Sequence, residues 1–281
     1  LPMNDSSNFG ADFHCDPNTI ITLQDETAAQ PKNGAPTTTD SYVSQLRTDP
    51  YAANLVLAIP GISGGQGSGF GDYSADIKGS GSNKTLTANS NAGVAITASY
   101  YGSALIFDGV DDFFTIPAND TDFQFGSGDF TVECWVNPNT VSANGGFFGI
   151  WNNSDNRRSF VLYHNGSASY NLALSSAGTT GDLSLSGFTL STTNQWHHIV
   201  GEREGSTARL YVNGVVVGIK TDLGTTSLYT NTQDTFAIGT WNNTNDNNNT
   251  FDGYIQDIRV YKGVAKYKGG FDVPKPYTPV G

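Results

Sequence analysis

Charged residues are scarce in this sequence, at 14% of its 281 residues, and most of them are acidic. Fourteen Lys and Arg stand against 26 Asp and Glu, which gives a formal net charge of -12. The sequence has no basic stripe that could neutralise phosphate groups, so we expect no nucleic-acid binding. Its longest apolar runs, such as 55–60, are much shorter than the roughly 20 residues of a membrane-spanning helix. We therefore expect a soluble protein that does not insert into a membrane.

Cysteine is rarer still, with only Cys15 and Cys134 in the chain. Cys134 alternates with Val132 and Val136, a pattern typical of one face of a buried strand, so we expect both cysteines to be free thiols. Helical periodicity is missing as well, because no segment of ten residues carries an apolar stripe at helical spacing. The abundance of glycine, 33 residues, favours short strands joined by tight turns.

The first 49 residues lack sustained periodicity, and 28–39 has the composition of a linker. We predict an N-terminal arm and linker over 1–49, followed by one β domain over 50–281. Two interpretations of the arm stay open, a disordered terminus and an extended segment that lies along a neighbouring subunit. The second draws on several apolar side chains in the arm, which are Phe9, Phe13, Ile20, Ile21 and Leu23.

From Tyr51 onward the pattern is that of short strands. Asn213-Gly214 predicts a two-residue hairpin turn, since both positions of that turn need positive φ. The glycine-rich loop 61–71 matches no phosphate-binding fingerprint, because we expect no helix after it. These features predict a two-sheet sandwich or jelly roll. The expected strands lie at 55–59, 94–97, 104–107, 113–116, 130–136, 147–151, 160–164, 170–174, 183–188, 196–200, 208–212, 215–219, 235–239 and 251–261.

Five segments resemble, in order and spacing, the laminin-G-like, concanavalin-A-like jelly-roll family. The resemblance covers about 100–262 and implies an all-β, two-sheet antiparallel jelly-roll sandwich, here with an extended N-terminal arm. The flanks 48–57 and 264–277 resemble the subgroup found in structural proteins of tailed bacteriophages. The five segments are 104–113 (ALIFDGVDDF), 128–136 (GDFTVECWV), 195–200 (QWHHIV), 210–214 (LYVNG) and 251–261 (FDGYIQDIRVY).

This family includes sugar-binding lectins, adhesion modules, decorations on virus particles and, in one branch, glucanases. Fold alone does not choose among them. The flanks favour a non-catalytic protein on the virion surface, a capsid decoration or fibre component that presents an adhesion or carbohydrate-binding module. The resemblance then implies a homo-oligomer whose arm contacts other virion proteins and whose sandwich faces a host surface glycan. The alternatives are a free extracellular bacterial lectin and a glycan hydrolase.

Hydrolysis of a glycan needs two carboxylates about 5 to 10 Å apart. The Glu-x-Asp-x-x-Glu pattern of the glucanase branch is missing. Glu202 and Glu204 form the nearest pair, and we expect both to be solvated at a hairpin mouth because Gly205-Ser206 turns the chain. Glu133 has no acidic neighbour in sequence and is expected to be structural, so we expect no enzymatic activity. His197 and His198 point to opposite faces of a strand and cannot together bind one ion.

Calcium is the most plausible ion, because it prefers oxygen ligands from carboxylates and loop carbonyls. The turn from Asp108 to Asp112 is compact and acidic, and in the resembling family ion sites draw on loops at the rim of the sandwich. We take Asp108 and Asp111 as candidate ligands, with Asp257 as a second choice. The alternative is that Asp and Gly only form the turn.

A Trp-Asn-Asn motif occurs twice, each time where a strand is predicted to end. An aromatic face with amide groups beside it is suited to sugar recognition. We expect the two motifs to lie at the same end of the sandwich and to form a shallow glycan-binding surface. The alternative is that each Trp caps the core. The candidate residues are Trp151, Asn152 and Asn153 in the first motif and Trp241, Asn242 and Asn243 in the second.

Overall fold

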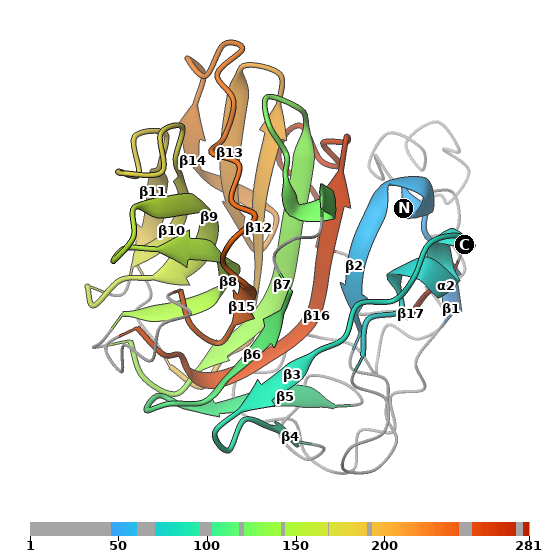
Figure 1. Ribbon diagram of the computed structural model, residues 1–281, viewed down its shortest axis with the longest axis vertical. Coiled ribbons are helices and arrows are strands. Elements are labelled where there is room, and N and C mark those ends of the chain that lie inside the picture. The colour runs from blue at the N-terminus through green and yellow to red at the C-terminus, as the bar shows by residue number, and fades with distance from the viewer. Residues whose placement is uncertain are drawn as a thin grey trace, which may run out of the picture.

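The computed structural model consists of two antiparallel β-sheets packed face to face (Figure 1), which confirms the predicted all-β sandwich. The helices in the part of the chain described are short, and none is long and apolar enough to cross a membrane. Residues 1–45, which hold Cys15 and nearly all of the predicted arm, lie outside that part. The structure describes residues 46–60, 71–95, 103–117, 121–141, 144–167, 169–189, 193–241, 249–273 and 278–280.

One sheet has eight strands in the order β14-β13-β12-β7-β16-β5-β4, with β2 pairing β16 as well. β7 and β16 are its long central strands. The hairpin between β13 and β14 turns at Asn213 and Gly214, whose φ angles of 50° and 79° confirm the predicted turn. The bounds are β2 Leu55–Ile59, β4 Gly93–Ala95, β5 Ala104–Asp108, β7 Phe130–Pro138, β12 His197–Glu204, β13 Thr207–Val212, β14 Val215–Lys220 and β16 Asp252–Lys262.

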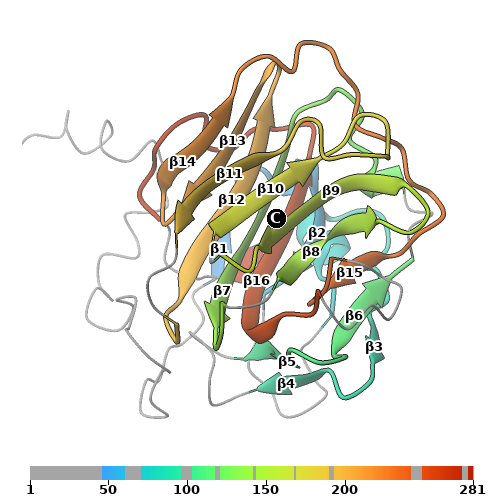
Figure 2. The same ribbon diagram turned by 90° about the vertical axis from the view of Figure 1, so that its left-hand side faces the viewer.

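The other sheet has seven strands in the order β11-β10-β9-β8-β15-β6-β3. Figure 2 shows β8, β9, β10 and β11 in front of the eight-stranded sheet. β11 and β14, the edge strands of the two sheets, lie against each other along one side of the sandwich. The bounds are β3 Thr87–Asn89, β6 Phe113–Ile116, β8 Gly145–Asn152, β9 Arg157–His164, β10 Ser169–Leu174, β11 Leu185–Thr189 and β15 Phe236–Ile238.

The core lies between the sheets, where alternate side chains of each strand meet. On β7, Val132, Cys134 and Val136 are fully buried in one cluster with Phe160 and Leu162 of β9. Cys134 is a free thiol, as predicted, and burial raises its pKa well above the ordinary value. The alternation seen in the sequence therefore identifies the side chains of β7 that face the core, while the strap buries residues of its other face.

Smaller elements flank the sandwich. β1 (Leu46–Thr48) and β17 (Thr278–Val280) form a two-stranded parallel sheet, and two 3₁₀ turns cover Ala52–Asn54 and Thr121–Phe123. The helix α2 (Ser74–Lys78) follows the glycine-rich loop, so the expectation that no helix comes after that loop is wrong. Five residues are too few to produce a helical period in the sequence.

After β16, residues 263–273 cross the outer face of the eight-stranded sheet, and we call this segment the C-terminal strap. Thr131 of β7 accepts a hydrogen bond from the amide of Lys266 and donates its hydroxyl to the carbonyl of Val264. Further along, the Phe271 amide donates to the carbonyl of Gly214 in the β13–β14 hairpin. The strap thus spans from β7 to the edge of the sheet.

Candidate functional site

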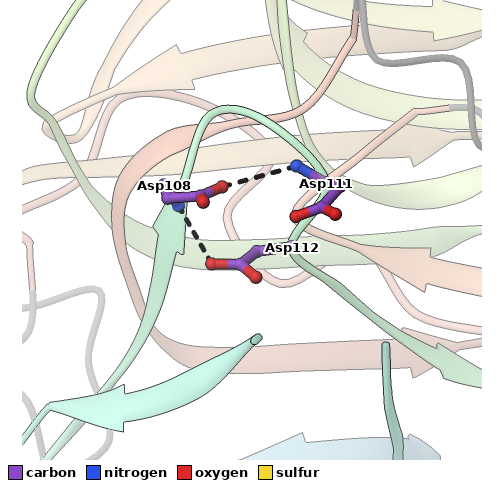
Figure 3. A group of neighbouring side chains, drawn as sticks. All are labelled: Asp108, Asp111 and Asp112. Carbon is purple, nitrogen blue, oxygen red and sulfur yellow. Dashed lines mark hydrogen bonds between the residues drawn. The ribbon is translucent and has the colours of Figure 1, made fainter. Parts of the chain in front are cut away.

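The acidic turn after β5 brings three carboxylates together (Figure 3). One ligand oxygen from each of Asp108, Asp111 and Asp112 lies within 4.8 Å of the other two. β5 ends at Asp108, and Gly109 with φ 76° reverses the chain so that Asp112 faces back toward Asp108. The structure adds Asp112 to the predicted ligands Asp108 and Asp111. In the sequence, only the position of Asp112 within the same short turn could have indicated it.

Much of the acidity in this turn is used to shape it. Asp108 accepts hydrogen bonds from the amides of Val110 and Asp111, and Asp112 accepts from the amides of Asn91 and Asp108. Burial, followed by the charge of Asp108, raises the pKa of Asp112. A cation bound here would relieve the repulsion between the carboxylates of Asp108 and Asp112. The hydrogen bonds to backbone amides fit the alternative interpretation, in which the Asp residues only form the turn.

The structure does not bring Asp257 to the acidic turn, so the second-choice ligand is wrong. Asp257 lies in β16, buried, and accepts two hydrogen bonds of 2.8 Å from the guanidinium of Arg259. Burial raises its pKa to about 6 against the opposing charge of Arg259. The β16 residue opposite Asp108 is Asp252, five positions earlier in the chain. Asp252 instead accepts a hydrogen bond from the Asn139 side chain and is not part of the group of three carboxylates.

Trp151, at the end of β8, is only 8% exposed, so its ring is not an open platform for a sugar. It is not a cap of the core between the sheets either. Its ring packs with Val161 and Ala173 on the outer face of the seven-stranded sheet, and its indole N–H donates to Asn153 Oδ1 at 3.0 Å. Both interpretations of this tryptophan therefore need correction.

The amide groups of Asn152 and Asn153 hold the β8–β9 corner. Asn152 is fully buried and donates to Asp234 at 2.9 Å and to Asp155 at 3.1 Å. Asn153 Oδ1 accepts from Arg158 Nε at 2.7 Å in addition to the Trp151 indole. These contacts use both polar atoms of the buried Asn152 amide and the oxygen of the half-buried Asn153 amide.

Trp241 differs from Trp151 because its side chain is half-buried. Its ring lies against Tyr163 of β9, with 4.6 Å between ring centroids and 57° between planes. The indole N–H finds no hydrogen-bond partner in the described ranges. Asn242 and Asn243 lie outside those ranges.

The two tryptophans occupy opposite ends of β8, so the expectation of one shared end is wrong. β15 pairs antiparallel with β8, with Ala237 opposite Gly149, and a motif that follows β15 must therefore lie at the start of β8. Gly146 at this start is opposite Tyr163, and a Cβ at Gly146 would overlap the backbone of Trp241. Both tryptophans still belong to one cluster on the outer face, together with Val161, Ala173 and Tyr163.

Glu202 is fully buried, so the expectation of a solvated Glu202–Glu204 pair is wrong for this residue. Its carboxylate accepts from the amides of Tyr267 and Lys268 in the strap, at 2.7 and 2.9 Å, and from the Tyr211 hydroxyl at 2.9 Å. Glu204 is half-buried and pairs with Arg209 at 3.0 Å. Nothing near Glu202 in sequence reveals the strap that covers it.

Glu133 is buried beneath the same strap. It accepts hydrogen bonds from Lys266 and the Tyr267 hydroxyl and lies 3.6 Å from His198 Nε2. Burial acts to raise its pKa, but the charges of Lys266, His198 and Arg259 outweigh this effect and lower the pKa to about 2. Glu133 is therefore an ionised group that anchors the strap, which agrees with the structural role predicted for it.

A family model described as the concanavalin A-like lectin/glucanases superfamily matches residues 107–266, more than half of the chain. The chain belongs to this superfamily. In this superfamily member the match runs from the end of β5 into the strap. It includes the acidic turn, Trp151 and Trp241, and the buried Glu133 and Glu202. No curated protein sequence matches the chain.

Solved structures with the same fold include toxin binding domains. The binding domain of Paraclostridial Mosquitocidal Protein 1 aligns with a TM-score of 0.56 and 14% identity, over 78% of this chain and 51% of that one. The binding domain of botulinum neurotoxin serotype D aligns with a TM-score of 0.53 and 14% identity, over 78% and 51%. Botulinum neurotoxin type C, which depends on interaction with two ganglioside molecules to enter cells, aligns with a TM-score of 0.51 and 12% identity, over 76% and 50%. This superfamily member thus spans about half the length of these structures, and the likeness shows its fold alone.

Proposed function

We propose that this chain is a non-catalytic carbohydrate-binding adhesion module that binds sugar at Tyr163 and Trp241. The observation that carries the proposal is this half-buried aromatic pair on the outer face of the seven-stranded sheet. A sugar ring stacks its C–H face on an aromatic side chain, and the side chains of Tyr163 and Trp241 are both half-buried rather than covered. The ganglioside dependence of one structural neighbour supports a sugar as the ligand class.

The distribution of glutamates supports binding without hydrolysis. A glycosidase needs two carboxyl groups flanking the sugar. In the described part of the chain, all three glutamates lie on β7 and β12 of the opposite sheet. Glu133 and Glu202 are buried under the strap. The proposed sugar site therefore lacks a glutamate pair.

The test uses Trp241→Ala, with Trp151→Ala as a matched control, on an array of immobilised glycans. Trp241→Ala should abolish binding with a small loss of stability. Trp151→Ala should destabilise the protein by about 3–5 kcal/mol, as buried Trp deletions do, while the folded fraction keeps its glycan binding. Unchanged binding by Trp241→Ala would refute the site. Release of reducing sugar above background from a bound glycan would refute the non-catalytic role.

We also propose that the module belongs to the virion surface of a tailed phage, as a capsid decoration or fibre component. The flanking segments carry this part of the proposal. β1 and β17 lie on the side of the molecule away from β9 and β10 (Figure 1), so a particle attached near the chain ends would leave the aromatic pair facing outward. Deleting residues 1–40 should leave a folded sandwich that no longer joins its particle. Normal incorporation of the deletion variant would refute attachment through the arm, and absence of the intact protein from purified virions would favour a free extracellular lectin.

A further inference from the structure

A chain of aromatic rings runs between the two sheets from the surface to the middle of the core. Phe188 of β11 lies 6.0 Å from Tyr170 of β10 and 6.1 Å from His197 of β12, measured between ring centroids. Tyr170 in turn lies 6.0 Å from His197 and 5.6 Å from Phe147, which packs against His164 at 5.9 Å. We call His164, Tyr170 and His197 the interior polar cluster.

Each member of the interior polar cluster has a buried polar atom that is not used. The Tyr170 hydroxyl, His164 Nε2 and His197 Nε2 have no hydrogen-bond partner in the described ranges. The three residues are 0%, 2% and 6% exposed, so water at the surface does not satisfy them either. Unsatisfied polar groups are rare in protein cores because each costs free energy. His164 Nε2 is turned toward Gly145 of β8. The Tyr170 hydroxyl and His197 Nε2 belong to two rings with centroids 6.0 Å apart, and these two atoms point to a missing binding partner.

The hydrogen-bonding roles of these atoms follow from their neighbours. Asn213 Oδ1 accepts from the His198 amide, so Asn213 Nδ2 is the atom that faces His197 Nδ1 at 3.3 Å. His197 Nδ1 therefore accepts, and Nε2 carries the proton and can donate. His164 Nδ1 faces the carbonyl of Asn165 at 3.5 Å, which places the proton on Nδ1 and leaves Nε2 as an acceptor. Burial lowers the pKa of both histidines to about 4, consistent with neutral rings.

Phe188 connects this cluster to the surface and has a strained backbone. It is 41% exposed, with φ of 60°, a left-handed conformation that is unfavourable for a bulky residue. The pairing of β10 with β11 skips Phe188, because Ser169 is opposite Thr189 and Tyr170 is opposite Gly187. This bulge turns the Phe188 ring onto Tyr170, where the two planes differ by 8°. Release of this strain would favour movement of the ring away from the cluster.

We propose that the interior polar cluster is a binding site for a small flat apolar molecule that carries a hydroxyl group, admitted when Phe188 turns aside. The hydroxyl accepts a hydrogen bond from His197 Nε2 and donates to the Tyr170 oxygen. The apolar part takes the place that the Phe188 ring leaves beside Tyr170 and His197. The site is separate from Tyr163 and Trp241, which lie on the outer face of the sheet. The proposal therefore does not depend on the proposed sugar binding.

Phenol and benzene are the matched probes, because they differ only in the hydroxyl group. Thermal unfolding is measured as each probe is titrated into the full-length protein and into Tyr170→Phe. Phenol should raise the midpoint in a saturable manner and bind at least tenfold more tightly than benzene. Tyr170→Phe should weaken phenol binding about tenfold and leave benzene unchanged. Equal effects of phenol and benzene, or no change in Tyr170→Phe, would overturn the proposal.

An ordered water molecule is the simpler occupant, and the same variant identifies it. If only water binds, phenol has no effect at any concentration and Tyr170→Phe lowers the midpoint because the water loses a partner. Either result overturns the proposal. The route is tested with Phe188→Gly, which removes the ring and suits the positive φ. The exchange rate of phenol, measured by NMR, should rise at least tenfold in this variant, and an unchanged rate would overturn the role of Phe188.

Discussion

Lys266 of the strap donates a hydrogen bond to the carboxylate of Glu133, 133 residues earlier in the chain. Both side chains are at least nine-tenths buried. Lys266 also lies over the Tyr261 ring, 4.1 Å from its centroid. The pair therefore holds the strap on β7 from within a site that excludes water, where each charge depends on the other.

Removal of the Lys266 charge should strongly destabilise the protein. Lys266→Met leaves Glu133 buried without its main counter-charge, and we expect a loss of about 3–5 kcal/mol in the free energy of unfolding. Chemical denaturation measures this loss. Lys268→Met is the matched control, because Lys268 is exposed and 3.6 Å from Glu204, and it should change stability by less than about 1 kcal/mol. Equal effects of the two variants would show that the strap charge at Lys266 has no special role.

Stability should fall as the pH is lowered from 6.5 toward 4. Burial lowers the pKa of His164, His197 and His198 to about 4, so in this window the unfolded chain binds protons that the folded protein does not. Asp257, whose folded pKa is raised to about 6 chiefly by burial, acts in the opposite direction between pH 6 and 3.8. As the pH falls, each of the three histidines lowers the free energy of unfolding and Asp257 raises it. The net loss is about 2.7 kcal/mol per pH unit where all four groups contribute.

Unfolding midpoints between pH 7.5 and 4.5 test this slope. His198→Gln removes one buried histidine and should reduce the slope by about 1.4 kcal/mol per pH unit. A stability that stays level across the window would mean that these histidines titrate normally in the folded protein.

Gly214→Ala should cost more than the positive φ alone. A Cβ at this position would overlap the Phe271 carbonyl oxygen of the strap. Gly205→Ala is the control, since Gly205 has φ 54° and open space around the added Cβ. We expect about 1 kcal/mol for Gly205→Ala and at least about 2 kcal/mol more for Gly214→Ala. Equal melting temperatures for the two variants would indicate that the strap does not pack on the hairpin in solution.

We propose calcium as the ion for the acidic turn, and calcium should then stabilise the protein by mass action. At a hundredfold excess over the dissociation constant the gain is about 2.7 kcal/mol. Melting curves in calcium and in chelator measure it, and Asp111→Asn should reduce the difference. Identical midpoints in calcium and chelator would remove Asp108 and Asp111 as ligands and leave them as turn residues.

Local patterns in the sequence predict most of the longer strands because the side chains that face the core recur at every second residue. Val132, Cys134 and Val136 occupy every second position of β7, and Asn213-Gly214 needs no distant contact to turn. Elements as short as β3 and α2 leave no such pattern, and both were missed. The short α2 shows that a five-residue helix can follow a loop without any periodic signal.

The candidate site depends on contacts between distant segments, which is why the sequence predicts less of it. Trp151 and Trp241 have similar local motifs, but the antiparallel pairing of β8 with β15 sends them to opposite ends. Glu202 is followed by a turn that suggests exposure, and the strap that buries it begins 61 residues later in the chain, at 263. Only Asp112 was within reach of a local argument, since the turn that contains Asp108 and Asp111 also contains it.

The parallel pairing of β1 with β17 determines how this fold responds to a pulling force. Leu46 is opposite Thr278 and Thr48 is opposite Val280, so the two strands run in the same direction. The chain joins β1 at one end of the pair and leaves β17 at the other. Tension between the flanking segments therefore loads the backbone hydrogen bonds of the pair in shear, all at once, whereas an antiparallel pair would open one bond at a time. Such a clamp resists stretching before any strand of the sandwich is disturbed.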